Sequence, residues 1–276
     1  MKKIVIIIIL IVLLIINYIK NRNIIILINK ININLNLNNP ISCMTYNIQR
    51  LPYSNKSYPV FLKKNDYDIV CLQEYFQNII YSRVDFLKKL DYNICIPSSI
   101  SPFKWDSGLV ILSKFEIKFI DLIPFKINKS IDKLCEKGFL IVKIGDLYVI
   151  NTHLQANYND SNKYNKIIKS QLKQIENYII DNLILNECLL LGDFNFNLKK
   201  INLNKKINLK LISGKINTNW NNTQNDSTKY KKYLNQNGIN CDGGFITNNK
   251  LKVSDINNVD IDKYTDHLGL SFKLRL

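Results

Sequence analysis

The stretch LLLGDFNFN, residues 189–197, joins an aliphatic run to a group of polar side chains. Continuous apolar runs of this kind are typical of a strand that is buried on both faces. Asp193 and Asn195 come directly after the run. Each of them could occupy an ordinary turn after Gly192, because Asp and Asn are favoured in turns. The decisive feature is that the same pattern, an apolar strand with a polar end, recurs along the chain.

The polar residues at the ends of apolar runs form an ordered set. They occur in CMTYNIQRL (43–51), DIVCLQE (68–74), VINTHLQA (149–156), CDGGFITN (241–248) and YTDHLGL (264–270), and they are Asn47, Glu74, His153, Asp242, Asp266 and His267. Taken singly, Asn47 fits a turn and Glu74 fits the start of a helix. The histidines carry more weight, because the chain contains only 2 of them. If these strand ends converge, they form an oxygen-rich site with two imidazoles, which suits Mg²⁺.

The 276 residues are 46% hydrophobic, which is enough for one large α/β domain or two small ones. Apolar runs predict strands at 42–48, 68–73, 107–113, 138–144, 146–152, 187–192, 243–247 and 268–274. Apolar residues recur at helical spacing within 163–182, and a second helix is predicted over 78–90. This mixed order of strands with few helices predicts an α+β or layered α/β fold.

The first residues predict a membrane anchor. MKK is followed by thirteen unbroken aliphatic residues at 4–16, and NYI extends the apolar stretch to residue 19. At about 1.5 Å per residue this stretch reaches roughly 24 Å, somewhat less than the ~30 Å of a hydrocarbon core. A cleaved signal peptide would need small residues, and no Gly, Ala or Ser precedes Ser42. We therefore expect an uncleaved single-pass anchor over 1–19, with its orientation open because basic residues flank both ends.

Residues 20–40 are rich in Asn and are expected to form a low-complexity tether, so that the globular domain covers 41–276. The net charge of +16 is concentrated at the N-terminus and in one internal segment. Residues 199–232 hold nine Lys and one Asp, and we interpret 199–237 as a basic insert. It could bind nucleic acid or an anionic membrane, or it could be a solvated loop. The 6 cysteines form no CxxC pair, which argues against a zinc site and leaves disulfides open.

The ordered set N…QE…G…TH…GDFN…D…DH resembles the endonuclease/exonuclease/phosphatase superfamily over residues 41–276. That superfamily includes deoxyribonuclease I, abasic-site endonucleases, inositol polyphosphate 5-phosphatases and neutral sphingomyelinases. The resemblance implies an α+β fold, a four-layer α/β/β/α sandwich with two central, mainly antiparallel sheets, preceded here by the N-terminal anchor helix. It also implies that the site lies at the upper edges of the two sheets.

The resemblance further implies a metal site. Glu74 looks like the principal ligand of a divalent cation, Mg²⁺ with Mn²⁺ as the alternative, and Asn47 looks like the residue beside it. Asp266 is implied to reach the metal region. A divalent ion held there would neutralise the charge of a phosphate ester during attack by water.

Further residues match the catalytic positions of the superfamily. Asp193 and Asn195 look like the pair that orients the attacking water and the phosphate. His267 looks like a general base or charge stabiliser whose ring is held by Asp242, and His153 looks like the second imidazole, at the transition state or the leaving oxygen. Histidine suits proton handling near neutral pH, and an adjacent carboxylate fixes its tautomer. The segment that begins at Asp242 reads Asp-Gly-Gly-Phe, which departs from the superfamily's Asp-Tyr-aliphatic pattern.

THLQA at 152–156 and Gln171 in the following helix resemble the sphingomyelinase branch more than the nucleases. Together with the anchor they predict a Mg²⁺-dependent phosphodiesterase that uses in-line water attack on a membrane lipid, releasing phosphocholine from sphingomyelin or a relative. The alternative is a DNA or RNA nuclease, in which Trp220, Tyr230 and Tyr233 of the basic insert stack on bases. A third class is a catalytically dead, membrane-tethered binding module, and the intact polar set argues against it. No protein partner is implied.

Overall fold

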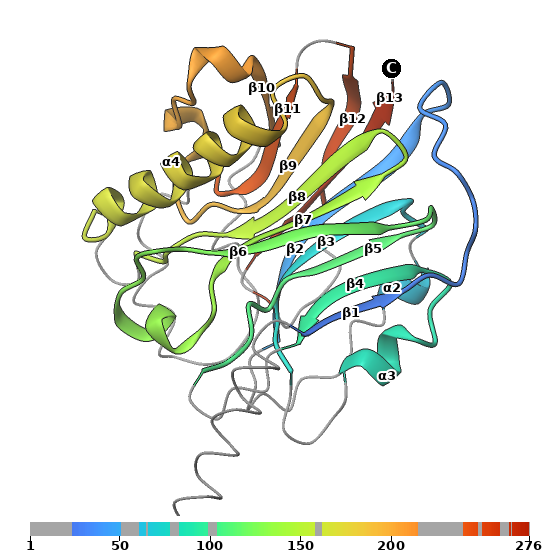
Figure 1. Cartoon of the computed structure of the whole chain (residues 1–276), viewed down its shortest axis with the longest axis horizontal. Coiled ribbons are helices and arrows are strands. Elements are labelled where there is room, and N and C mark those ends of the chain that lie inside the picture. Colours follow the sequence, from blue (N-terminus) through green and yellow to red (C-terminus); the bar gives the residue numbers. More distant parts are fainter. Residues whose placement is uncertain are drawn as a thin grey trace, which may run out of the picture.

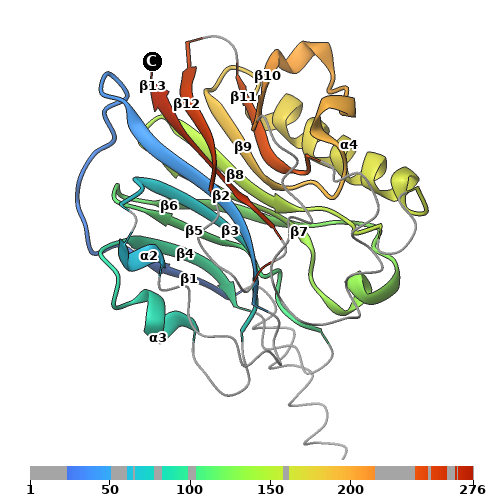
Figure 2. The same cartoon turned by 180° about the vertical axis from the view of Figure 1, so that it is seen from behind.

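Two β-sheets pack face to face and form the body of the protein (Figures 1 and 2). The computed structural model describes residues 24–50, 61–64, 66–77, 83–98, 104–157, 162–214, 240–247, 250–259, 265 and 267–275. The seven-stranded sheet has the order β1 (Ile24–Ile28), β4 (Asn93–Ser98), β5 (Val110–Ser113), β3 (Ile69–Tyr75), β2 (Ile41–Arg50), β13 (Gly269–Arg275) and β12 (Lys252–Val259). The six-stranded sheet has the order β10 (Leu209–Ser213), β11 (Asp242–Thr247), β9 (Cys188–Asp193), β8 (Leu147–His153), β7 (Gly138–Ile144) and β6 (Lys118–Pro124).

The strand directions explain where polar groups gather. β2 runs parallel to β3 in the first sheet, and β8 runs parallel to β9 in the second. The remaining paired strands of both sheets are antiparallel. The carboxyl ends of two adjacent parallel strands lie at the same edge of their sheet. Each sheet therefore brings two strand ends to one place, and the expected, mainly antiparallel pair of sheets is confirmed.

The apolar core consists of three clusters of buried side chains. Leu189 and Leu191 of β9 pack between the sheets, whereas Leu190 packs in the cluster that includes Ile168 and Ile175 of the long helix α4 (Asn165–Asn182). Successive side chains of a strand face opposite sides, so a strand covered on both faces becomes apolar throughout. This alternation accounts for the unbroken aliphatic run that precedes the GDFN segment.

The outer face of the seven-stranded sheet carries two short helices. These are α2 (Phe61–Lys64) and α3 (Arg83–Leu87), and their side chains join a third apolar cluster with Met44 and Tyr46 of β2. The layers are therefore helix, sheet, sheet and helix, as the resemblance implied. The helix predicted over 163–182 is confirmed as α4, whereas of the helix predicted over 78–90 the described part shows only α3.

Every predicted strand corresponds to an observed one, and β7 has the predicted bounds. The strands without a prediction are β1, β4, β6, β10 and β12, and four of these lie at the sheet edges. The edge strands β6, β10 and β12 contain polar residues and lack an unbroken apolar run, because an edge strand exposes part of its surface to solvent. In β12, for example, no side chain is buried.

The segment expected to be a tether contains part of the sheet. Ile24–Ile28 pairs antiparallel with β4, and Leu37 is buried in the core between the sheets. The prediction of a tether over 20–40, with the domain beginning at Ile41, is therefore wrong from Ile24 onward. The physical reason is the IIILI run, whose β-branched side chains favour a strand although Asn-rich sequence surrounds it.

The basic insert is likewise ordered at its start. Short 3₁₀ helices at Leu198–Lys200 and Lys205–Ile207 lead into β10, which pairs with β11 at the edge of the six-stranded sheet. Residues 215–239 lie outside the described residues, so the insert over 199–237 stays a prediction. All six cysteines are buried free thiols.

The predicted anchor over 1–19 also lies outside the described residues. Among the residues that the structure describes, no helix has both the length and the apolar character needed to cross a membrane.

One buried amide joins the N-terminal segment to the domain. Asn93 is fully buried, and its Nδ2 donates to the carbonyl oxygens of Ile31 (2.7 Å) and Phe115 (2.8 Å). Its Oδ1 accepts from the backbone nitrogens of Lys30 (2.6 Å) and Ile31 (2.8 Å). A single side chain therefore satisfies four backbone groups, and residues 30–31 are held against the loop that follows β5.

We expect Asn93→Ala to destabilise the fold strongly. The substitution removes partners from four backbone groups, and each buried group left unpaired costs about 1–3 kcal/mol, so the free energy of unfolding should fall by about 3 kcal/mol or more. Asn38→Ala is the matched control, because Asn38 is exposed on the same N-terminal segment. Urea unfolding measures both variants. Equal midpoints for them would show that the N-terminal segment adds nothing to the domain.

Candidate active site

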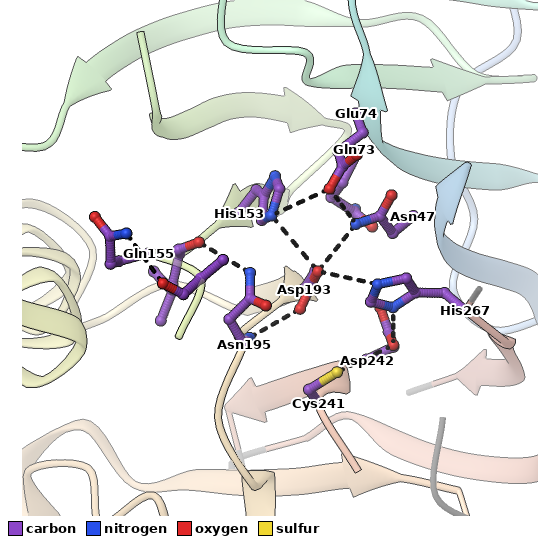
Figure 3. A network of polar contacts seen from close by, with 12 residues as sticks. Asn47, Gln73, Glu74, His153, Gln155, Asp193, Asn195, Cys241, Asp242 and His267 are labelled. Atoms are coloured by element: carbon purple, nitrogen blue, oxygen red, sulfur yellow. Dashed lines mark hydrogen bonds and ion pairs between the residues drawn. The ribbon is translucent and has the colours of Figure 1, made fainter. Parts of the chain in front are cut away.

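The ends of four strands converge at one edge of the sandwich (Figure 3). Asn47 lies opposite Gln73 in the parallel pair β2–β3, and Glu74 is the next residue of β3. His153 lies opposite Asp193 in the parallel pair β8–β9. The predicted convergence of these residues from two sheets is confirmed.

The centre of the site is an amide between two carboxylates. Asn47 Nδ2 donates to Glu74 Oε1 at 3.0 Å and to Asp193 Oδ2 at 3.0 Å. Asp193 is 1% exposed, and burial together with the nearby carboxylate of Asp242 raises its pKa above the ordinary value. The Asn47 amide thus holds two acidic groups from different sheets close together. Like charges at this separation repel, and a cation or a proton relieves the repulsion.

Backbone conformation helps to aim these side chains. Glu74 (φ 54°) and Asn195 (φ 47°) both lie in the left-handed region, which is unfavourable for residues with a Cβ. Asn195 is held there by its own backbone nitrogen, which donates to Asp193 Oδ1 at 2.8 Å, and by its Nδ2, which donates to the carbonyl oxygen of Leu154 at 3.1 Å. Glu74 and Asn195 of the site therefore both have a left-handed backbone conformation that non-glycine residues rarely adopt.

Glycines allow the strands beneath the site to approach closely. A Cβ at Gly192 would lie 2.0 Å from the carbonyl oxygen of Thr152 on β8, and a Cβ at Gly244 would lie 1.9 Å from that of Leu190 on β9. Both distances are far below van der Waals contact. A Cβ at Gly243 would also lie 2.6 Å from the carbonyl oxygen of Ile212, so neither the Tyr nor the aliphatic residue of the Asp-Tyr-aliphatic pattern fits at positions 243 and 244 in this arrangement.

His267 is held by a carboxylate. Its Nδ1 lies 2.8 Å from Asp242 Oδ2, and its Nε2 lies 3.8 Å from Asp193 Oδ2. Burial alone would lower the pKa of His267, but the carboxylates of Asp242 and Asp193 outweigh it and raise this pKa well above the ordinary value. The predicted contact between Asp242 and the His267 ring is present. Asp266 lies outside the described residues, so its role in metal binding stays a prediction.

His153 approaches the same centre from the opposite side. Its Nε2 lies 3.5 Å from Asp193 Oδ2, 3.7 Å from Glu74 Oε1 and 3.1 Å from Lys137 Nζ. Burial, the Lys137 ammonium and His267 together hold the pKa of His153 well below the ordinary value. In the absence of a bound cation, the two imidazoles around Asp193 therefore differ in protonation at neutral pH.

Lys137 and Asp132 are site residues that the sequence did not predict. Lys137 is 2% exposed, lies 3.0 Å from Asp132 Oδ1 and donates to the carbonyl oxygen of Leu154 at 2.8 Å. Asp132 Oδ2 also accepts from the backbone nitrogen of Ala156 at 2.9 Å. Among 34 lysines, the position of Lys137 directly before β7 was the only sequence signal, and that signal is weak.

Gln171 supports the strand end from α4. Its Oε1 accepts from the backbone nitrogen of Gln155 at 2.8 Å, and its Nε2 donates to the carbonyl oxygen of Ile127 at 2.9 Å. A buried amide in the helix therefore joins the segment after His153 to the loop before β7. The sequence had singled out Gln171 by resemblance, and the structure provides the physical reason.

Two groups of side chains could hold a metal ion. In Glu74, His153 and Asp193 the ligand atoms lie within 4.8 Å of one another, and so do those of the second group, Asp193, Cys241, Asp242 and His267. Mg²⁺ prefers hard oxygen ligands, and the first group offers two carboxylates. Asn47 turns its Nδ2 toward both carboxylates while its Oδ1 accepts from the backbone nitrogen of Gln49 at 3.1 Å, so it positions the carboxylates and presents no oxygen to a metal here. The second group contains a thiol, and its His267 and Asp242 already bond to each other. The first group is therefore the one that suits Mg²⁺.

Comparison with known proteins identifies the family. Residues 44–231 match the model of the Endonuclease/Exonuclease/phosphatase family. The chain belongs to this family. A sphingomyelinase of Dictyostelium discoideum is 29% identical over 190 residues, which cover 61% of this chain and 41% of the relative. Sphingomyelinase C of Bacillus cereus is 28% identical over 200 residues, which cover 60% of this chain and 59% of the relative.

This family member thus spans between about two fifths and three fifths of the length of those relatives. A crystal structure of a double mutant of Staphylococcus aureus beta toxin with bound magnesium ions has a TM-score of 0.60 at 20% identity. The likeness covers 85% of this chain and 99% of the toxin. At this level of identity it shows the fold, which agrees with the two-sheet sandwich described above.

The opposite pKa shifts of the two imidazoles predict a simple titration. The chain has only 2 histidines, so the imidazole signals in an NMR spectrum of untagged, metal-free protein can be assigned by His153→Gln and His267→Gln. We expect the His267 signal to titrate above pH 6.5 and the His153 signal below it. Asp242→Asn should lower the pKa of His267, because it removes the nearest negative charge.

Asp146→Asn is the matched control for this experiment, since Asp146 is an exposed carboxylate in the turn between β7 and β8. It should leave both titrations unchanged. Identical pKa values for the two imidazoles, or a His267 titration unaffected by Asp242→Asn, would contradict the electrostatic description of the site.

Proposed function

We propose that the chain is a Mg²⁺-dependent phosphodiesterase that hydrolyses a phospholipid, sphingomyelin or a relative, and releases phosphocholine. The observation that carries this proposal is that Glu74, Asp193 and both histidines meet at one edge of the two sheets. Family membership supports hydrolysis of a phosphate ester, and the sphingomyelinase relatives support the lipid substrate.

Glu74 and Asp193 are the residues that would bind Mg²⁺, with Mn²⁺ as the alternative, and Asn47 would hold their carboxylates in place. A bound ion would supply positive charge to the phosphate oxygens. The Asn47 amide fixes the separation of the two carboxylates, so the ligand set is organised before substrate arrives. Asp266 remains a predicted contributor to this region.

Proton handling falls to the two imidazoles. Asp242 holds the Nδ1 side of His267, so its Nε2 faces Asp193 and the centre of the site (Figure 3). In this orientation the protonated His267 ring can stabilise charge on the phosphate, whereas the neutral form of the ring could take a proton from an attacking water. Asn195 and Asp193 lie beside that position and would orient the water.

His153 and Lys137 form the opposite side of the site. The buried Lys137 ammonium places positive charge beside the His153 ring, which suits stabilisation of a developing negative charge on the leaving oxygen. The site therefore has one side for the attacking water and another for the departing alcohol, as in-line displacement requires.

Substitutions in the site should abolish turnover without unfolding the protein. We expect His153→Ala and His267→Ala each to lower kcat by about 10²–10⁴-fold, and Glu74→Gln to have an effect of similar size. Phosphocholine release from sphingomyelin vesicles measures activity, and thermal unfolding measures the fold. Chelation of divalent cations should abolish activity, and added Mg²⁺ should restore it.

The matched control is Asp181→Asn, which removes an exposed carboxylate from α4. It should leave kcat unchanged. A histidine variant with near-normal kcat would remove that histidine from the mechanism.

A nuclease is the second candidate function, and the lysines at the ordered start of the basic insert support it. Lys199, Lys205, Lys206 and Lys210 are exposed beside β10 and could contact a phosphate backbone. Plasmid nicking without phosphocholine release would favour this function. Absence of both activities with every divalent cation would favour a binding module instead.

We further infer that residues 1–19 attach the chain to a membrane. The support is the aliphatic run at 4–16, which no charged residue interrupts. We expect the full chain to remain in the membrane fraction after alkaline extraction, and a variant with Lys placed at Leu10 and Leu14 to be released. Release of the full chain by alkaline washing would contradict the anchor.

A further inference from the structure

The loop between β6 and β7 exposes large aliphatic side chains beside the site. Ile127 is 44% exposed, Ile131 56% and Leu134 49%. Figure 1 shows this green segment at the lower left, below α4. We call residues 126–134 the docking loop. Clustered exposed aliphatic residues are unusual on a protein surface, and they mark contact with another apolar surface.

The charged residues of the docking loop are arranged asymmetrically. Lys126, Lys129 and Lys133 are exposed, whereas the only carboxylate in the loop, Asp132, is 5% exposed and pairs with the buried Lys137. The outward side therefore combines three aliphatic side chains with three positive charges and presents no negative charge. Such a surface is complementary to an anionic one.

The aliphatic residues are exposed although the loop backbone is firmly held. Gln171 Nε2 donates to the carbonyl oxygen of Ile127 at 2.9 Å, and the backbone nitrogen of Lys129 donates to Gln155 Oε1 at 2.7 Å. The backbone nitrogen of Trp105 donates to the carbonyl oxygen of Leu134 at 2.7 Å. The exposed side chains are thus presented in a fixed arrangement.

These observations select one kind of partner. Nucleic acid would engage the lysines but would leave three aliphatic side chains in water, and a second copy of this chain would be repelled by the net charge of +16. A lipid bilayer that contains anionic lipids engages both groups, because aliphatic side chains enter the acyl boundary while lysines remain among the headgroups.

We infer that the docking loop binds the surface of an anionic bilayer and holds the neighbouring site close to the lipid headgroups. This inference rests on the proposed function, since it supplies the lipid on which the site would act. The loop is coupled directly to the site, because Asp132 pairs with Lys137, which contacts His153. Docking would therefore bring lipid headgroups into the neighbourhood of the residues that are proposed to hydrolyse them.

A fluorescent probe in the full chain tests the docking loop separately from the N-terminus. All six native cysteines are buried, so an environment-sensitive dye can be attached to an introduced surface cysteine at Ser130→Cys. We expect its emission to shift to the blue with vesicles of phosphatidylcholine, sphingomyelin and phosphatidylserine. The same dye at Leu185→Cys, a 92% exposed position after α4, should show no shift.

Two variants of the labelled protein test the two halves of the surface. They are Ile127→Ser/Ile131→Ser/Leu134→Ser and Lys126→Gln/Lys129→Gln/Lys133→Gln. We expect each to lower the equilibrium constant for docking of the loop by roughly 100-fold, which for the lysines is about fivefold per charge, so the blue shift should be largely lost although residues 1–19 keep the protein on the vesicle. Both variants change only exposed side chains, so their thermal unfolding midpoints should match that of the parent. Vesicles without phosphatidylserine should weaken the shift to a similar degree.

An unshifted spectrum at position 130, or a shift that survives both triple substitutions, would overturn the docking loop. A shift that is equal with and without phosphatidylserine would overturn the anionic surface as its partner. The spectral readout does not depend on catalysis. A protein that docks but releases no phosphocholine would therefore refute the proposed reaction alone, and a protein that hydrolyses sphingomyelin without a shift would refute the docking loop alone.

Discussion

The hydrogen bonds from Asn47 to Glu74 and Asp193 are the contacts on which the site depends. Glu74 belongs to one sheet and Asp193 to the other, so the amide fixes how the two sheet edges meet. The contact holds two carboxylates together in a largely buried place, where repulsion between like charges is poorly screened. An amide can donate to both groups but cannot neutralise them. A cation or a proton at the junction of the sheets would relieve this repulsion.

A second polar contact lies beneath the first and supports it. Gln73 Nε2 donates to Asn151 Oδ1 at 2.7 Å, which joins β3 to β8 across the interior. Asn151 in turn donates to the carbonyl oxygens of Leu72 (2.8 Å) and Val110 (3.0 Å). Both amides are fully buried, and a buried polar contact specifies one relative position of two apolar surfaces better than apolar packing does. The register of the sandwich at the site therefore depends on these amides.

Asp193 also explains why two identical side chains acquire different chemistry. His153 and His267 both face it, yet a lysine lies beside the first ring and a second carboxylate beside the other. The resulting opposite pKa shifts separate a neutral imidazole from a protonated one within a few ångströms. The different surroundings of the two histidines, rather than their residue type, give them different protonation states. The docking loop is connected to the site by an ion pair, since its buried Asp132 pairs with Lys137, the lysine beside His153.

The sequence by itself determined the central strands, the long helix and most of the site. Strands covered on both faces must be apolar throughout, so the apolar runs before Asp193 and His153 were enough to predict these strands. The polar residues at the ends of the runs predicted the position of the site. Edge strands such as β10 and β12 escaped prediction because their exposed faces admit the same polar residues as loops. The tether interpretation failed because the short apolar run of β1 is embedded in Asn-rich sequence.

Only the tertiary structure decided the relations between distant residues. It showed that Asn93 holds residues 30–31 to the domain and that Lys137 contacts His153, contacts that no spacing along the chain reveals. It also decided that Asp132 points inward while Ile127, Ile131 and Leu134 point outward. Local sequence sets which side chains are apolar or charged. Whether a given charge is buried with a partner or exposed to a membrane depends on packing between segments that the sequence separates.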